Sequence, residues 1–145
     1  MTDAELFETL KGKTLLRIEG SVGDSELIFY ATKGATYKLY HKQDCCESVI
    51  LEDICGDLND LIGEELLEAE VVTNSEENPP GAKPEWQDDS FTWTFYKLRT
   101  MKGGVTIRWY GSSNGYYSEA VSCVMEQLDA TENFKRSVIN ASEEE

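Results

Sequence analysis

The chain has 145 residues, and it contains only one histidine, only three prolines and no long run of apolar residues. A helix that crosses a membrane needs about 20 consecutive apolar residues, whereas the apolar runs here, such as residues 27–30, are short. The N-terminus is acidic, but a secretory signal begins with basic residues followed by an apolar stretch. The sequence therefore predicts a cytoplasmic protein without a membrane partner.

Positive charge is also scarce. The chain has 13 lysines and arginines against 28 aspartates and glutamates, which gives a net charge of −15. Such a charge repels phosphate backbones, so we expect no direct binding of nucleic acid. It favours basic partners or imitation of the charge of DNA, although solubility alone also accounts for it.

The four cysteines, at positions 45, 46, 55 and 123, form no CxxC motif. A single histidine does not complete an ordinary Cys/His zinc set. Disulfides are typical of exported proteins, and no export signal is seen, so free thiols are expected. We expect neither a metal nor a cofactor.

The pattern of apolar and polar residues predicts a mainly β fold (α+β) with about seven mostly antiparallel strands in two meanders. Alternation with a period of two indicates strands at residues 14–19, 26–32, 35–41, 65–73, 90–100, 105–110 and 116–123, with a further candidate at residues 48–54. Strand 90–100 places Phe91, Trp93 and Phe95 on one face. Strand 105–110 places Arg108 and Tyr110 on the face opposite Trp109.

Short helices are predicted at both ends and near the middle of the chain. Thr2 and Glu5 have the spacing of a capping box at the start of a helix over residues 2–10. Asp57 is placed to cap a helical turn within residues 56–62. We expect residues 1–125 to form a single compact β-rich domain, residues 74–89 an exposed loop, and residues 126–145 a loosely helical or flexible acidic tail.

The first candidate site lies in residues 41–48, which contain His41, Asp44, Cys45, Cys46 and Glu47. These residue types ligate transition metals, and a histidine activates a neighbouring thiol. Adjacent side chains of an extended chain point in opposite directions, however, so the two cysteines are poorly placed to bind one ion together. A corner that binds a ligand or has a structural role is the alternative.

The second candidate site lies in residues 108–117. Arg108 can pair with a phosphate, the aromatic rings can stack on a base, and the Gly/Ser/Asn loop offers backbone N–H groups to anions. The loop does not match a Walker motif. The alternative is an aromatic hairpin packed in a β core, with Arg108 paired to an acidic residue.

Several uncommon strings occur in a fixed order, namely YKLYHKQDCCESV at residues 37–49, LEDICGDL at 51–58, NPPG at 78–81, SFTWTFY at 90–96 and TIRWYGSSNGYYS at 106–118. Over roughly residues 10–121 the chain resembles a family of small acidic proteins of unknown function from bacteriophages and bacterial genomes. The resemblance implies a phage context, and hence the host cytoplasm if a phage encodes the chain. It supplies no catalytic residues.

The leading hypothesis is a non-catalytic phage-type binding protein that sequesters a small nucleotide-like immune signal of the host and so counters anti-phage defence. Two alternatives are an acidic protein that inhibits a host defence protein, with a DNA mimic as one form, and a thiol- or metal-dependent enzyme that uses His41, Cys45 and Cys46. Pairing of strand edges leaves a homo-oligomer open. The predicted ligand-binding residues are His41, Asp44, Glu47, Trp93, Arg108, Tyr110, Asn114, Tyr116 and Tyr117.

Overall fold

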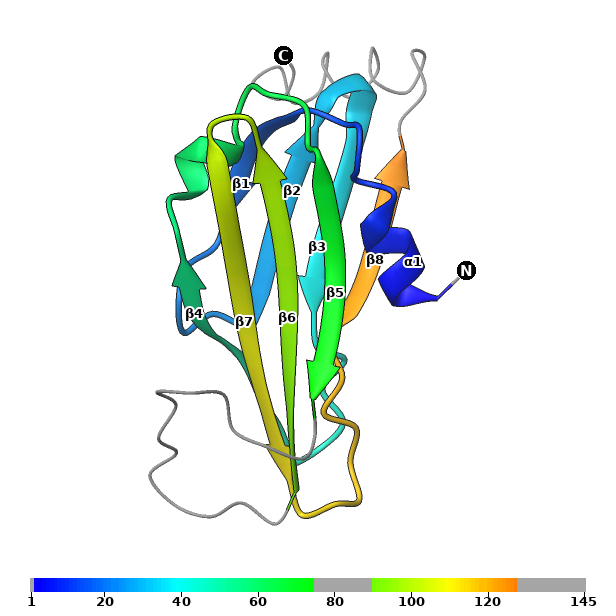
Figure 1. Ribbon diagram of the computed structural model, residues 1–145. Coiled ribbons are helices and arrows are strands. Elements are labelled where there is room, and N and C mark those ends of the chain that lie inside the picture. Colours follow the sequence, from blue (N-terminus) through cyan, green and yellow to red (C-terminus); the bar gives the residue numbers. More distant parts are fainter. Residues whose placement is uncertain (1, 75–89, 128–145) are drawn as a thin grey trace.

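The computed structural model describes residues 2–74 and 90–127, and within them eight strands form two antiparallel sheets packed face to face (Figure 1). The first sheet has the order β1 (Leu15–Glu19), β2 (Glu26–Ala31), β3 (Ala35–Tyr40) and β8 (Ser122–Gln127). The second has the order β4 (Ser48–Cys55), β7 (Gly103–Ser113), β6 (Ser90–Thr100) and β5 (Glu68–Asn74). The molecule is a β-sandwich.

The predicted mainly β class is confirmed, and the strands number eight rather than about seven. Strands β1, β2 and β3 form one meander, and β5, β6 and β7 form another. The strand predicted at residues 116–123 is wrong in position. Residues 114–121 form a loop, and β8 begins at Ser122 and pairs with β3 of the other sheet. Alternation alone does not show which sheet a strand joins.

The C-terminal helix expected after Val124 is replaced by a strand as far as Gln127. Cys123 faces the core and Val124 faces outward, which is the period-two alternation of a strand. The remainder of the expected tail, residues 128–145, lies outside the described residues, as do residues 75–89 of the expected loop.

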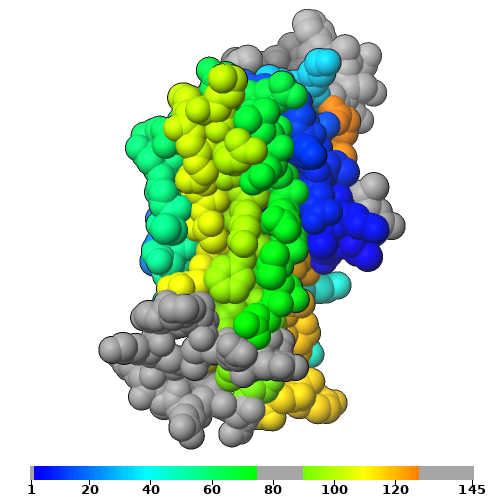
Figure 2. Space-filling model, in the orientation of Figure 1, coloured from blue at the N-terminus to red at the C-terminus, as the bar shows by residue number. Residues whose placement is uncertain are grey.

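The core lies between the sheets and is built from alternate residues of each strand. Tyr37 and Leu39 of β3 face Ile107 and Trp109 of β7 across it, and all four are fully buried. On β6 the core face carries Tyr96 and Leu98. The aromatic face of Phe91, Trp93 and Phe95 therefore lies on the outside of the second sheet, which is the face seen in Figure 2.

The described part of the chain has three short helical elements, namely α1 (Asp3–Glu8), η1 (Thr32–Gly34) between β2 and β3, and η2 (Leu58–Leu61) between β4 and β5. The capping box of Thr2 and Glu5 is present at the start of α1. Phe7 of α1 enters the core between the sheets, with ring centroids 6.0 Å from Phe29 and 4.7 Å from Tyr96. Asp57 caps η2 by accepting a hydrogen bond from the backbone N–H of Asn59. No helix in the described part of the chain is long and apolar enough to cross a membrane.

Candidate functional site

Two described loops lie together at one end of the sandwich, the lower end in Figure 1. They are the β3–β4 loop (residues 41–47) and the β7–β8 loop (residues 114–121), and we call them together the loop end. The β1–β2 loop (residues 20–25) lies beside β4 instead. The β1–β2 loop is tied to β4 by two backbone hydrogen bonds, from Gly23 N–H to the Leu51 carbonyl and from Leu51 N–H to the Asp24 carbonyl. Loops carried on a rigid sandwich are common places for binding residues.

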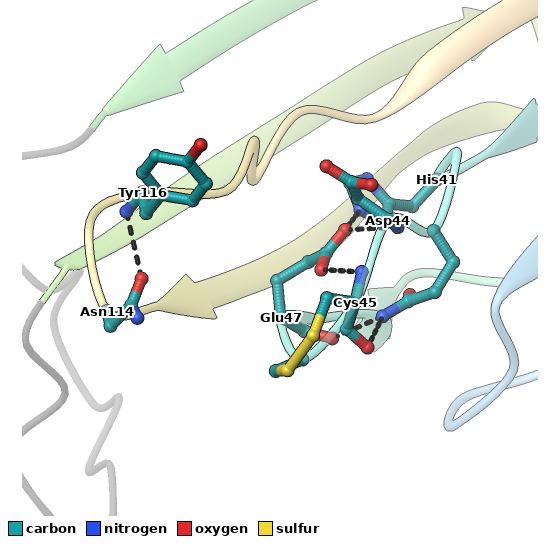
Figure 3. The surroundings of a disulfide bond; sticks show 8 residues. His41, Asp44, Cys45, Glu47, Asn114 and Tyr116 are labelled. Atoms are coloured by element: carbon teal, nitrogen blue, oxygen red, sulfur yellow. Dashed lines mark hydrogen bonds and ion pairs between the residues drawn. A yellow bond between two sulfur atoms is a disulfide. The ribbon is translucent and has the colours of Figure 1, made fainter.

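The β3–β4 loop is folded around the carboxylate of Glu47, whose side chain is fully buried. The carboxylate accepts hydrogen bonds from the backbone N–H of Asp44 at 2.8 Å and of Cys45 at 2.9 Å, and it accepts one from His41 Nε2 at 2.6 Å (Figure 3). Gln43 Nε2 donates to the carbonyl of Glu47 at 2.7 Å. The loop therefore satisfies its own polar groups and has a defined shape.

His41 joins this loop to the next one. Its Nδ1 lies 2.7 Å from the carbonyl oxygen of Ala120 in the β7–β8 loop, and its side chain is 3% exposed. Both ring nitrogens therefore have oxygen partners, one in each loop. His41 and Glu47 thus form a buried hydrogen-bonded pair. Because both ring nitrogens already have partners, the arrangement argues against a cysteine enzyme activated by His41.

The pKa of Glu47 is lowered from 4.5 to about 2. The hydrogen bond from His41 is the largest cause. Burial acts in the opposite direction, and the backbone hydrogen bonds add to the lowering. The carboxylate is consequently charged throughout the neutral and mildly acidic range.

The expectation of four free thiols is wrong for the β3–β4 loop, where Cys45 and Cys46 are joined by a disulfide (Figure 3). The chain bends at these residues instead of running extended, so the two side chains do not diverge as they would in a strand. Cys55 is free and exposed, and Cys123 is free and buried. Burial, followed by the charge of Asp3, raises the pKa of Cys123 to about 12.

A second buried carboxylate, Glu119, organises the β7–β8 loop. It accepts a hydrogen bond from Thr92 Oγ1 of β6 at 2.8 Å and one from Ser113 Oγ of β7 at 2.6 Å. Ser113 Oγ in turn accepts from the backbone N–H of Gly115. The loop is thereby fixed to the ends of both strands.

Beyond these contacts the same loop presents two tyrosines. The N–H of Tyr116 donates to Asn114 Oδ1 at 2.9 Å, and the ring of Tyr116 meets that of Tyr117 edge to face with 4.9 Å between centroids. Tyr116 is 82% exposed. Figure 3 shows Asn114 and Tyr116 apart from the group around Glu47, and the loop projects from the lower end of the molecule in Figure 2.

Arg108, Trp93 and Tyr110 lie elsewhere, on the outer face of the second sheet. Arg108 Nε donates to Glu52 Oε1 at 2.6 Å, its Nη2 lies 3.7 Å from Asp53 Oδ2, and its guanidinium lies 5.1 Å from the centre of the Trp93 ring. Arg108 is thus paired with acidic residues, as the alternative interpretation of this segment predicts. Trp93 is only 2% exposed, and its centroid is 4.5 Å from that of Tyr110, so its ring is not open to a base.

The predicted residues therefore fall into three groups. His41, Asp44 and Glu47 come together in the β3–β4 loop, Asn114, Tyr116 and Tyr117 belong to the β7–β8 loop, and the Arg108 group lies on the sheet. Sequence reasoning missed Glu119 and Gln43, because an acidic or amide residue in an acidic chain gives no sign that it is buried or bonded.

A hollow of about 400 Å³ lies between the β3–β4 loop and the last residues of the β7–β8 loop, and Asn114, Tyr116 and Tyr117 are not among its lining residues. Lys42, Gln43 and Asp44 line it from one loop, and Ser118 lines it from the other. In the part of the chain that the structure describes, no three His, Cys, Asp or Glu side chains are placed to hold a metal ion. The loop end offers hydrogen-bonding groups, aromatic rings, the exposed cation Lys42 and the exposed Cys45–Cys46 disulfide.

These features define a small antiparallel β-sandwich with a loop-built end. The family model for a domain of unknown function, DUF7448, matches residues 8–123, and the chain belongs to this family. No curated protein and no solved structure matches the chain.

Proposed function

We propose that this chain is a non-catalytic binding protein that recognises a protein partner through its loop end. One observation carries the proposal. Residues 111–118, which lead from β7 into the loop end, consist only of glycine, serine, asparagine and tyrosine, and Tyr116 is 82% exposed. This is the composition of antibody binding loops, in which tyrosine supplies contact area at low entropic cost and the small polar residues supply adaptable hydrogen bonds.

The way the loops are held supports the proposal. Glu47, with His41, fixes the β3–β4 loop, and Glu119 fixes the β7–β8 loop to β6 and β7. Loops that are ordered before binding lose less conformational entropy when a partner docks. The buried carboxylates thus act as supports for the exposed tyrosines.

The net charge of −15 indicates the electrostatic character of the partner. A basic protein surface would be attracted to this chain and would associate faster at low ionic strength. A host defence protein is the partner class that the phage resemblance suggests, and the chain would then act as its inhibitor.

Comparison of two equally exposed side chains at opposite ends of the molecule tests this proposal. Tyr116 is at the loop end and Met101 is in the β6–β7 turn at the other end, and both are 82% exposed. Wild type, Tyr116→Ser and Met101→Ser would be immobilised and exposed to a bacterial lysate. Any retained protein would be purified and titrated against each variant.

We expect Tyr116→Ser to weaken binding about thirtyfold, the loss of a hot-spot residue worth about 2 kcal/mol, and Met101→Ser to bind as wild type does. Affinity should also fall as NaCl rises from about 0.05 to about 0.5 M. A partner that tolerates Tyr116→Ser but is lost by Met101→Ser would place the interface at the other end and refute the proposal.

The small nucleotide-like ligand is a second candidate, favoured by the hollow of about 400 Å³ beside Lys42. Its volume is in the range of small-molecule sites, and Lys42 is a cation suited to a phosphate. Calorimetric titration with mono- and dinucleotides tests it. Loss of binding in Lys42→Ala with retention in Arg108→Ala would place the ligand in the hollow, whereas the reverse would place it on the outer face of the second sheet.

A further inference from the structure

We propose that Cys45 and Cys46 are a reversible redox pair whose oxidation state controls the order of the loop end. The effect on a partner would rest on the proposed function, but the chemistry and its structural consequence do not. Both cysteines are exposed, and they lie in the middle of the β3–β4 loop. A low-molecular-weight thiol or disulfide therefore has access to them.

The pair is self-contained. Cys55 lies at the far end of β4, seven residues beyond Ser48, or about 23 Å along an extended strand. Cys123 is buried, and its raised pKa keeps it in the unreactive thiol form. Because Cys45 and Cys46 are adjacent, each resolves a mixed disulfide formed on the other, without the approach of another segment of the chain.

Thiol–disulfide exchange with a small disulfide oxidises Cys45 and Cys46 in two steps. The thiolate of one cysteine attacks a sulfur of a small disulfide such as oxidised glutathione, which forms a mixed disulfide and releases one glutathione thiolate. The thiolate of the neighbouring cysteine then attacks the protein sulfur of that mixed disulfide and releases the second glutathione. The two protein thiols lose two electrons and two protons, and oxidised glutathione takes up these electrons and protons as it becomes two glutathione thiols.

The pair is coupled to the rest of the loop end through its own backbone. The N–H of Cys45 donates to Glu47 Oε1 at 2.9 Å, and the carbonyl of Cys45 accepts from Gln43 Nε2 at 3.3 Å. The same Glu47 carboxylate holds His41, which reaches Ala120 in the β7–β8 loop. Reduction of the disulfide frees the peptide unit between Cys45 and Cys46. The β3–β4 loop and the β7–β8 loop then both lose a restraint.

The first experiment tests whether the pair forms. The protein would be equilibrated in glutathione buffers of graded ratio, quenched with acid, alkylated and analysed by peptide mass spectrometry. We expect Cys45 and Cys46 to change together as a two-thiol unit that retains no glutathione, while Cys55, the exposed control, changes singly. Independent alkylation of Cys45 and Cys46 at every ratio, or a stable glutathione adduct on each, would overturn the proposal.

The second experiment tests the coupling by amide hydrogen exchange, without any partner present. Reduction should speed exchange at the amides of Asp44 and Cys45 about tenfold or more, as expected when hydrogen bonds to a charged group weaken. It should also speed exchange in residues 114–121. The double variant Cys45→Ser/Cys46→Ser should exchange like the reduced protein under both conditions. Equal exchange in the oxidised and reduced wild type would refute the coupling, whereas failure of the Tyr116→Ser test would refute only the proposed function.

Discussion

At the residue scale, the largest structural consequence comes from Glu47, a buried carboxylate that has three hydrogen-bond donors. Desolvation of a carboxylate is costly unless it is paired and hydrogen bonded. Here His41 Nε2 and two backbone N–H groups supply the hydrogen bonds. The group is therefore a structural support of the loop end, although its residue types first suggested direct contact with a ligand.

The pH dependence of folding should report this carboxylate. Because its pKa falls from 4.5 to about 2 on folding, its stabilising contribution is complete above pH 4.5 and is lost as the pH drops towards 2. In Glu47→Gln the carboxylate becomes an amide, and its NH₂ group would face hydrogen-bond donors where the carboxylate now accepts from them, or hydrogen bonds would be lost. The urea midpoint at pH 7 should therefore be lower than in wild type. The difference should shrink as the pH falls through this window.

The matched control is Asp44→Asn, which removes an exposed carboxylate from the same loop and keeps the backbone N–H that Glu47 binds. Its urea midpoint should follow that of wild type at each pH. Equal midpoints for wild type and Glu47→Gln at pH 7 would contradict the supporting role of this carboxylate.

At the scale of elements, β7 is in the middle of the second sheet and meets the loop end at its last residues. It contains Gly104 and Gly111. A Cβ at Gly111 would lie 2.6 Å from the carbonyl oxygen of Glu119 and 3.2 Å from Val49 Cγ2, whereas a Cβ at Gly104 has only ordinary contacts, from 3.6 Å. The close approach of the β7–β8 loop to its own strand therefore requires glycine at position 111.

Two alanine substitutions on this one strand should have different effects. Gly111→Ala should lower the free energy of unfolding by about 1–3 kcal/mol, the usual cost of overpacking. Gly104→Ala should change it by less than about 0.5 kcal/mol. Chemical denaturation measures both values, and equal costs would mean that residue 119 does not pack on β7 as described.

Helix α1 has a packing role that its length alone does not suggest. Phe7 is fully buried and contacts Phe29 of one sheet and Tyr96 of the other. Phe7→Ala should lower the free energy of unfolding by about 3–5 kcal/mol, since it removes an aromatic ring from a packed core. Leu16→Ala, which truncates a side chain that is mostly exposed on β1, should cost far less. A small loss for Phe7→Ala in thermal or urea unfolding would show that the helix is not needed to close the sandwich.

At the scale of the whole molecule, the excess of negative charge opposes folding, because like charges come closer together in the folded state. Raising NaCl from about 0.01 to about 0.15 M screens this repulsion, so the melting temperature at pH 7 should rise. The same titration near pH 4.4, the isoelectric point, is the control, since the net charge there is close to zero. An equal rise at both pH values would indicate a salt effect unrelated to net charge.

The sequence predicted the local features of the candidate site better than its arrangement. His41, Asp44 and Glu47 were grouped correctly because they are close in the chain, and the alternation of β7 placed Arg108 and Tyr110 opposite Trp109. Arg108 was wrongly grouped with residues of the loop end. Its partners Glu52 and Asp53 come from β4, and one sequence does not show which strand lies beside β7.

The sequence by itself determined the β class, the capped start of α1, the meander of β1, β2 and β3, and the acidic charge, because each follows from side-chain spacing or composition within a short segment. Tertiary structure decided that β8 joins the first sheet and that Phe91, Trp93 and Phe95 face outward. It also decided that His41 and Glu119 are buried supports. These features depend on contacts between distant segments, and a period of two marks the two faces of a strand without saying which one the core will cover.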